Sequence, residues 1–249
     1  MSRYFIEVCY DGTDFGGFQI QSNQVSIQGA LEQAMAIIYR MPIALTGASR
    51  TDAGVHAFQN FLHFDTNLEI TQKHIYNLNS ILPKSIVVKA IYEVPANAHC
   101  RFDAIKRSYL YKIHSQKDPF LEGRSWFYPY PVKVSALQEA ADLILSHTNF
   151  ESFSKKNTAV NTFDCKITKA QWIQEGSLLS FHIESNRFLR GMIRGFVGTM
   201  LHIGREHTNL EAFKEIILSR NEQNVDFSTP AHGLYLSSIQ YPDYFQKIL

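Results

Sequence analysis

The spacing of apolar residues changes from alternating to helical near the start of the chain. From Arg3 to Tyr10 apolar and polar residues alternate, which predicts a β-strand. After Ser26, a residue type that caps helices well, apolar residues recur at helical spacing as far as Tyr39. The sequence therefore predicts a strand followed by an amphipathic helix.

The same reasoning divides the rest of the first half into strands and helices. Two apolar runs predict strands at Ile43–Ala48 and Phe61–Asp65, and the β-branched run Ile86–Val94 predicts another. A helix is predicted over Gln72–Ile81, between a threonine cap and a proline stop. The order strand, helix, strand, strand, helix, strand is ferredoxin-like, with both helices on one face of an antiparallel sheet.

The second half repeats this pattern more loosely. It is predicted to contain strands at Arg107–His114, Lys166–Ile173, Leu179–Ser185 and Gly233–Tyr241, and helices at Val134–Leu145, Phe188–Ile203 and Leu210–Leu218. We therefore expect an α+β protein of two ferredoxin-like halves, residues 1–104 and 105–249, whose mainly antiparallel sheets flank a central cleft. A cleft between two such halves is a natural ligand site.

Composition excludes several classes of protein. With 45% hydrophobic and 19% charged residues, the 249-residue chain is typical of a soluble globular protein with a full core. No apolar run reaches membrane-spanning length, and the N-terminal segment has a strand pattern in place of a signal peptide. Three distant cysteines without a CxxC pair indicate neither a disulfide framework nor a cysteine zinc site. We therefore expect a cytoplasmic protein that does not bind a membrane.

A short polar loop between two predicted strands carries candidate chemistry. The stretch Gly47–Ala57, GASRTDAGVHA, places an arginine, an aspartate and a histidine close together. In extended backbone Arg50 and Asp52 point to the same side, so the guanidinium could help to keep the carboxylate ionised. A solvated turn with one surface ion pair explains the same residues, and the loop alone does not decide between the two.

Positive charge gathers in two places although the net charge is only +1. Arg187, Arg190 and Arg194 fall opposite the apolar face of the helix predicted there, and two glycines, Gly191 and Gly198, share their face. Guanidinium groups beside glycines suit a phosphate backbone that approaches closely, although a solvated helix face has the same pattern.

A second patch alternates basic with aromatic residues, a combination that suits nucleic acid because rings stack on bases and cations meet phosphates. For its tyrosines a core-facing strand is the alternative, and that alternative is favoured for Tyr111. The patch consists of Arg101, Lys106, Arg107 and Lys112 with Phe102, Tyr109 and Tyr111.

Taken in order, the motifs resemble those of the TruA-type tRNA pseudouridine synthases over nearly the whole chain. One short motif would be weak evidence, but RTDAGVHA is followed at proper distances by the tyrosine strand, the arginine-rich stretch and GLYL. The matching stretches are Tyr10–Gln19, Ser26–Ala34, Ser49–Ala57, Phe102–Tyr111, Asn149–Lys155, Phe188–Met200 and Gly233–Leu236.

The resemblance implies that uridine is isomerised to pseudouridine in the anticodon stem-loop of tRNA, at tRNA positions 38, 39 and 40, without a cofactor or metal. It implies that Asp52 is the catalytic carboxylate, as nucleophile or as base, and that Arg194 pairs with it. Tyr109 is implied to sit by the target base, in stacking or proton transfer. The implied enzyme is a homodimer that grips tRNA across both subunits.

Further residues are expected to bind the substrate. By resemblance, Arg50 holds the nucleotide that is flipped out of the RNA, and Leu234 lines the uracil pocket. The basic stretches add Arg107, Arg187 and Arg190 as contacts to the RNA.

Other functions remain open at this stage. A catalytically silent tRNA-binding protein of the same fold is one, although the joint presence of Asp52, Tyr109 and Arg194 argues against a decayed site. A hydrolase that uses His56 with Asp52 is another, but no serine or cysteine nucleophile context supports it. The histidines form no HxH or HxxxH pair, so no metal site is expected, and His63, His182 and His202 are interpreted as isolated structural residues.

Overall fold

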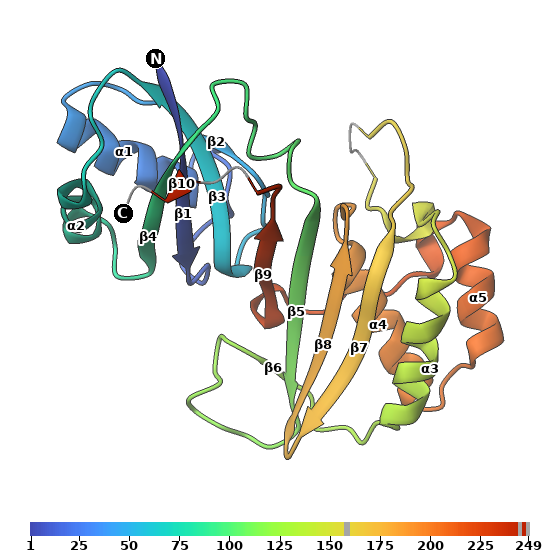
Figure 1. The fold of residues 1–249 in the computed structure, drawn as a ribbon. Helices are drawn as coiled ribbons and strands as arrows, with labels where there is room; N and C mark the ends of the chain where they lie inside the picture. The colour runs from blue at the N-terminus through green and yellow to red at the C-terminus, as the bar shows by residue number, and fades with distance from the viewer. Residues whose placement is uncertain (157–159, 244–245, 248–249) are drawn as a thin grey trace. The chain divides into compact units, whose positions relative to one another are not determined.

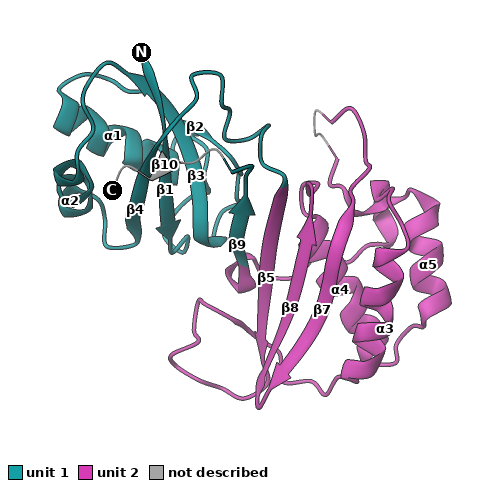
Figure 2. Ribbon diagram, viewed as in Figure 1, with its two compact units in different colours: residues 1–105, 235–249 teal, residues 106–234 magenta. Residues whose placement is uncertain are grey.

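The chain folds into two compact units. The computed structural model describes residues 1–156, 160–243 and 246–247. One unit comprises Met1–Ile105 with Tyr235–Leu249, and the other comprises Lys106–Leu234 (Figure 2). The sequence assigns the C-terminal segment to the second half, whereas here it groups with the first unit. The reason is that its strands β9 (Leu234–Gln240) and β10 (Gln246–Lys247) pair with strands of that unit.

The sheet of the first unit is built around its N-terminal strand, β1 (Ser2–Tyr10). β1 pairs antiparallel with β3 (His56–Thr66) on one side and with β4 (Ile86–Val94) on the other. The opposite edge of β3 pairs antiparallel with the short β2 (Thr46–Gly47) and in parallel with β9. The order β4-β1-β3-β2 is the ferredoxin-like order expected from the sequence (Figure 1).

Two helices of the first unit occupy the positions that the sequence predicts. α1 (Ile27–Tyr39) begins after Ser26, whose hydroxyl accepts a hydrogen bond from Gly29 N. α2 (Gln72–Ile81) packs against β4 and against α1 (Figure 1). Capping and periodicity are local properties, so both helices are readable from the sequence alone.

The long strands of the second unit pair antiparallel, and helices back the sheet that they form (Figure 1). β5 (Lys106–His114) pairs with β8 (Leu178–Ser185), which pairs with β7 (Ile167–Glu175). The helices α3 (Val134–Leu145), α4 (Met192–Gly204) and α5 (Leu210–Ser219) contact one another, and α3 packs on β7. The shorter elements are β6 (Trp126–Phe127), which pairs with β5, and the 3₁₀ turns η1 (Glu151–Phe153), η2 (Glu222–Asn224) and η3 (Ala231–Gly233).

The predicted α+β class with mainly antiparallel strand pairing is confirmed. The core of the second unit is aromatic, with Phe150, Phe153, Phe181, Phe196 and Phe213 fully buried.

Among the described residues, none of the helices has the length and apolar character that a membrane span requires.

The strand predicted over Ile43–Ala48 is reduced to the two residues of β2. The backbone of Leu45 is bonded to side chains of α1 and not to a neighbouring strand. Its N–H donates to the Glu32 carboxylate at 3.0 Å, and its carbonyl accepts from the Gln28 amide at 2.9 Å. These bonds satisfy the backbone without a sheet partner, so an apolar run of strand type lies outside the sheet.

The helix predicted from Phe188 begins only at Met192, so the predicted arginine face is wrong. Gly191 has a φ of +76°, in the left-handed region that a right-handed α-helix does not contain. Arg187 and Arg190 therefore precede α4. Gly198 does not admit a partner backbone either, because a Cβ added there would lie 2.3 Å from the carbonyl oxygen of Asp226 in this chain.

Candidate active site

The loop that carries Asp52 joins β2 to β3 and is fixed from beneath by buried polar groups. The Tyr10 hydroxyl lies 2.9 Å from Thr51 Oγ1, and Asn60 Nδ2 donates to the Ser49 carbonyl at 3.0 Å and to the Tyr10 hydroxyl at 3.2 Å. Asn60 is fully buried. Because Ser49 and Thr51 are held inward, Arg50 between them is exposed, and Asp52 is half-buried.

The expected contact between Arg50 and Asp52 is not observed. Within the described part of the first unit no ion pair joins the two side chains. The bonds at Ser49 and Thr51 turn the guanidinium of Arg50 outward, away from the interior. Arg50 is therefore available to a ligand of the loop, and it does not serve as the fixed counter-charge of Asp52.

The N-terminal glycine-containing segment packs against the same loop. A Cβ added to Gly12 would lie 2.1 Å from the Val55 carbonyl oxygen, so only glycine allows this approach. Phe18 N donates to the Thr51 carbonyl at 3.0 Å, and the Phe18 ring is buried. Phe18 therefore acts as a hydrophobic support for the loop and does not offer a stacking surface.

His56 anchors the end of the loop to the first strand. It is buried at the start of β3, where its Nδ1 accepts from Gly12 N at 3.1 Å and lies 3.1 Å from Asp11 Oδ1. Its ring stacks on Tyr235 with a centroid separation of 4.6 Å. Through Nδ1 the buried His56 holds the Gly12 backbone in place, which gives it a structural role at the end of the loop.

In the second unit, Tyr109 and Tyr111 share one face of β5 but differ in environment. The Tyr109 ring is half-buried and meets Phe188 edge-on at 5.1 Å between centroids. Tyr111 is fully buried, and its hydroxyl donates to the Pro230 carbonyl at 2.7 Å. Burial raises the pKa of Tyr111 far above its ordinary value. The preference for a core-facing Tyr111 is therefore confirmed.

Arg194 and Leu234 both lie close to Tyr111. Arg194, in the first turn of α4, donates from Nε to the Thr229 carbonyl at 2.6 Å, and Thr229 Oγ1 donates back to the Arg194 carbonyl at 2.7 Å. The positive charge of Arg194 opposes the rise in the pKa of Tyr111, which requires the two groups to be near each other. Leu234 follows Gly233, where an added Cβ would lie 2.7 Å from the Tyr111 ring. Arg194 and the Gly233 backbone that precedes Leu234 therefore lie beside Tyr111.

The other basic residues lie on β5 or in the segment between β8 and α4. Arg107 Nη1 donates to the Asn186 carbonyl at 3.1 Å, and the Arg190 carbonyl accepts from Lys155 N at 3.0 Å. Burial raises the pKa of the Cys165 thiol to about 11, and the nearby charge of Arg187 opposes this rise. Lys106 is paired with Glu184 at 2.9 Å, so it contributes less to a patch for RNA than the sequence suggests.

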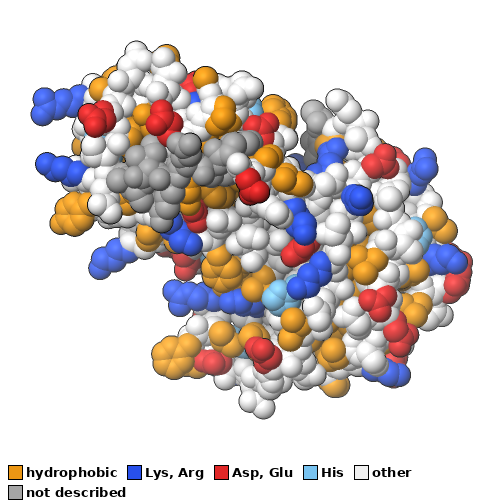
Figure 3. Space-filling model, viewed as in Figure 1, with side chains coloured by type: hydrophobic (Ala, Val, Ile, Leu, Met, Phe, Trp, Pro, Cys, Tyr) orange, Lys and Arg blue, Asp and Glu red, His pale blue; other side chains and the backbone are white. Residues whose placement is uncertain are grey.

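Basic side chains do not form one continuous field on the face drawn in Figure 3. Blue side chains of lysine and arginine are interspersed there with acidic and apolar ones, which agrees with the net charge of +1. Any binding of a polyanion must therefore depend on particular residues and not on overall charge.

Sequence reasoning did not single out the residues that support the Asp52 loop. Tyr10, Thr51 and Asn60 read as ordinary strand and loop positions. The available signal was Asn60, a polar residue directly before the apolar pair Phe61-Leu62 in β3, since a buried amide needs partners.

Comparison with known proteins identifies the family. Residues 8–103 and 140–242 match a family model described as tRNA pseudouridine synthase. A protein of Parabacteroides distasonis named tRNA pseudouridine synthase A is 40% identical over 245 residues, covering 98% of this chain and 97% of that protein. A protein of the same name from Porphyromonas gingivalis is 40% identical over 248 residues, covering 97% and 98%. Given this similarity and the loop of Asp52, the chain belongs to the tRNA pseudouridine synthase family.

Proposed function

We propose that this protein converts uridine to pseudouridine in the anticodon stem-loop of tRNA, at positions 38, 39 and 40. The observation that carries the proposal is the match over nearly the full chain to proteins named tRNA pseudouridine synthase A. The protein is thus an isomerase that acts on tRNA. The reaction breaks the bond from uracil N1 to C1′ and rejoins the base through C5. Because there is no net oxidation or reduction and no energy input, the proposal includes no redox or nucleotide cofactor.

The target uridine must first leave its stack, at a cost of a few kcal/mol. We assign this step to Arg50, whose exposed side chain lies on the fixed loop. Arg107, Arg187 and Arg190 are proposed to hold the RNA backbone. Binding of the RNA backbone precedes the chemical step. Variants of Arg107, Arg187 and Arg190 should therefore weaken tRNA affinity more than they slow pseudouridine formation on bound tRNA.

Asp52 is proposed as the catalytic carboxylate. Cleavage of the glycosidic bond produces positive character at C1′, which a carboxylate can meet as nucleophile or relieve as a base that removes a sugar proton. Both routes need the ionised form, which an arginine partner favours, and we propose Arg194 for that partner. Tyr109 would stack on the uracil or assist removal of the C5 proton, and Leu234 would line the base pocket.

The decisive variant is Asp52→Asn, which keeps the size of the side chain but cannot ionise. We expect pseudouridine formation in unmodified tRNA to fall by more than about a thousandfold, while tRNA affinity stays nearly unchanged. Single-turnover mapping of pseudouridine and a binding assay measure the two quantities. Asp243→Asn, at an exposed position of the same unit and outside the matching stretches, is the matched control and should be fully active.

Two outcomes would contradict the proposal. Substantial turnover by the Asp52→Asn protein would remove Asp52 from the catalytic role. Tight tRNA binding by the wild type without any pseudouridine would indicate the silent tRNA-binding protein.

The assembly and location are proposed on the same basis. We propose a homodimer that binds tRNA across both subunits, which light scattering of the purified protein would test through its molar mass. A cytoplasmic location fits the three cysteines, none of which is in a disulfide.

A further inference from the structure

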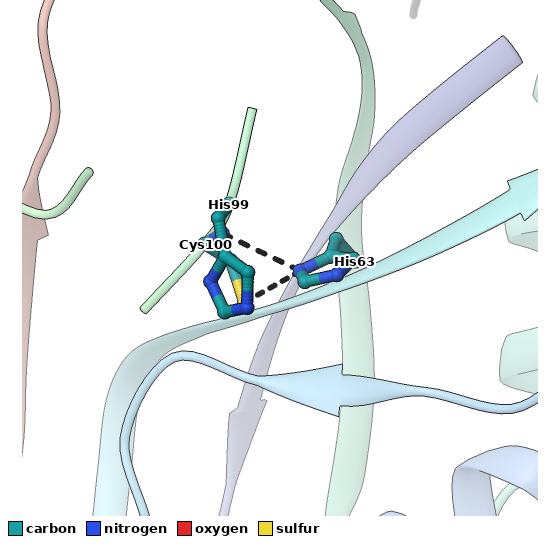
Figure 4. A group of neighbouring side chains, drawn as sticks. All are labelled: His63, His99 and Cys100. Carbon is teal, nitrogen blue, oxygen red and sulfur yellow. Dashed lines mark hydrogen bonds between the residues drawn. The ribbon is translucent and has the colours of Figure 1, made fainter. Parts of the chain in front are cut away.

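Three side chains with nitrogen and sulfur donors meet in the first unit, outside the residues assigned to catalysis. His63 lies on β3 and is buried, and His99 and Cys100 lie in the turn that follows β4. One donor atom from each residue lies within 4.8 Å of the other two. Figure 4 shows the three side chains turned toward one another. His63 is therefore a buried strand residue with hydrogen-bond partners, as predicted, but two other potential metal ligands lie next to it.

The hydrogen bonds between His63 and Cys100 are long or use a weak donor, although the His63 ring also stacks on Phe5 and meets the His99 ring edge-on. Cys100 Sγ lies 3.1 Å from His63 Nδ1 and 3.0 Å from the Thr46 carbonyl oxygen, and Cys100 N donates to the same His63 nitrogen at 3.4 Å. A thiol is a poor hydrogen-bond donor, and 3.4 Å is long for a hydrogen bond. A buried hydrogen-bonded cluster is the alternative explanation of the geometry, but it uses these donors poorly.

We propose that His63, His99 and Cys100 bind one Zn²⁺ ion. Two imidazoles and a thiolate are a donor set that zinc prefers. Bond lengths of about 2.0–2.3 Å place the ligand atoms of a tetrahedral zinc site about 3.5 Å apart, so small side-chain rotations suffice here. Water would fill the fourth position. The ion would tie β3 to the turn after β4 and stabilise the first unit.

Metal binding would change the protonation of Cys100 and the hydrogen bonds of both histidines. The Cys100 thiol loses its proton to solvent and becomes a thiolate ligand. His63 gives up its contacts with Cys100 and binds the metal ion through a ring nitrogen. Arg101 N now donates to His99 Nδ1 at 3.1 Å, and it loses this acceptor whichever ring nitrogen of His99 binds the ion. Arg101 is exposed, so water can replace that bond.

The backbone of the turn is already fixed around the proposed ligands. His99 N donates to Asp103 Oδ2 at 2.7 Å, and the Tyr241 hydroxyl donates to the Cys100 carbonyl at 2.5 Å. Such outer bonds hold metal ligands in position and reduce the ordering that binding requires. The turn therefore offers its two ligands from a fixed main chain.

Cobalt(II) tests the site because it reports its ligands through its absorption spectrum. The full-length protein is stripped with a chelator, checked for folding by circular dichroism, and titrated with Co²⁺. We expect one equivalent to give a thiolate-to-cobalt charge-transfer band and the visible bands of a tetrahedral site, and Zn²⁺ to displace both. Zn²⁺ should also raise the melting temperature of the stripped protein, since it binds the folded state.

Three variants decide whether these residues are the ligands. Cys100→Ser should abolish the charge-transfer band, and His99→Gln, at a half-buried position, should weaken Co²⁺ affinity at least about tenfold if the variant folds as the wild type does. Cys165→Ser, at a buried cysteine of the other unit, is the control and should keep the full spectrum. Absence of the band in the wild type, or its persistence in Cys100→Ser, would overturn the proposal. Neither result depends on activity toward tRNA.

Discussion

Two tyrosines on one strand face show how neighbouring residues of the same type acquire different roles. Tyr111 uses its hydroxyl to bond the Pro230 carbonyl inside the second unit, and burial raises its pKa far out of the range useful for proton transfer. Tyr109, two residues earlier, has a half-buried ring against Phe188. At this scale Tyr111 is a structural residue and Tyr109 is the candidate for contact with the base.

The variants Tyr109→Phe and Tyr111→Phe should therefore differ in what they lose: the first should lose rate and the second should lose stability. If Tyr109 moves a proton, loss of its hydroxyl should slow single-turnover pseudouridine formation by about a hundredfold and leave tRNA binding intact. Tyr111→Phe leaves the Pro230 carbonyl without its donor and should cost about 1–3 kcal/mol of unfolding free energy with little change in rate. A normal rate in Tyr109→Phe would leave Tyr109 only a stacking role.

At the scale of elements, the Asp52 loop depends on a strand that lies beneath it. Asn60 of β3 reaches the Ser49 carbonyl and the Tyr10 hydroxyl, and Tyr10 in turn contacts Thr51. The strands β1 and β3 therefore set the position of the residues on both sides of Arg50. Catalysis is sensitive to displacements of about 1 Å, so this support should matter for rate as well as for stability.

Replacement of Asn60 tests that support. Asn60→Leu keeps the branched shape of the side chain but removes both donor bonds, and we expect a loss of about 2 kcal/mol in unfolding free energy together with a fall in kcat on the order of tenfold or more. Asn79→Leu is the matched control, because Asn79 bonds both N–H and C=O of Val88 far along the chain from the loop. It should lose stability without losing kcat. Equal effects of the two variants on kcat would refute the positioning role of Asn60.

Gly191 sets the start of α4, and Gly176 serves as a reference for the cost of a left-handed backbone. Gly191 and Gly176 both have positive φ, +76° and +60°, but a Cβ would meet Lys155 Cγ at 3.0 Å in the first case and nothing within 4 Å in the second. Each alanine variant should cost about 1–2 kcal/mol for the left-handed backbone. Chemical denaturation should show an additional loss of unfolding free energy for Gly191→Ala, whereas equal losses in the two variants would show that Lys155 moves aside.

At the scale of the whole molecule, a net charge of +1 cannot draw a polyanion to the surface by itself. We therefore expect binding of tRNA to depend on a few basic side chains that each neutralise a phosphate. Lys106, which is paired with Glu184, is a poor candidate for this role, and Arg190, which is exposed before α4, is a better one.

The salt dependence of tRNA affinity measures this directly. Arg190→Ala should reduce the slope of log affinity against log salt concentration by about one, the amount expected for the loss of one phosphate contact. Lys73→Ala, at an exposed position of α2, should leave the slope unchanged. An unchanged slope in Arg190→Ala would remove Arg190 from the RNA contacts.

The sequence by itself determined the elements whose signals are local. The bounds of α2, α3 and β4 agree with their predicted ranges, because periodicity, caps and stops lie within the segment that they define. The order of the elements was also predicted correctly, and that order implies the ferredoxin-like arrangement of the first unit. The motif around Asp52 was also readable, since it is contiguous.

Only the tertiary structure decided where distant residues meet. The bonds from Leu45 to α1 side chains shortened a predicted strand, and the left-handed Gly191 delayed a predicted helix. His63 met Cys100 through the pairing of β1 with β3 and β4, and not through any spacing in the sequence. Periodicity reports which face of an element is apolar, but it does not encode which residues of other elements lie against that face.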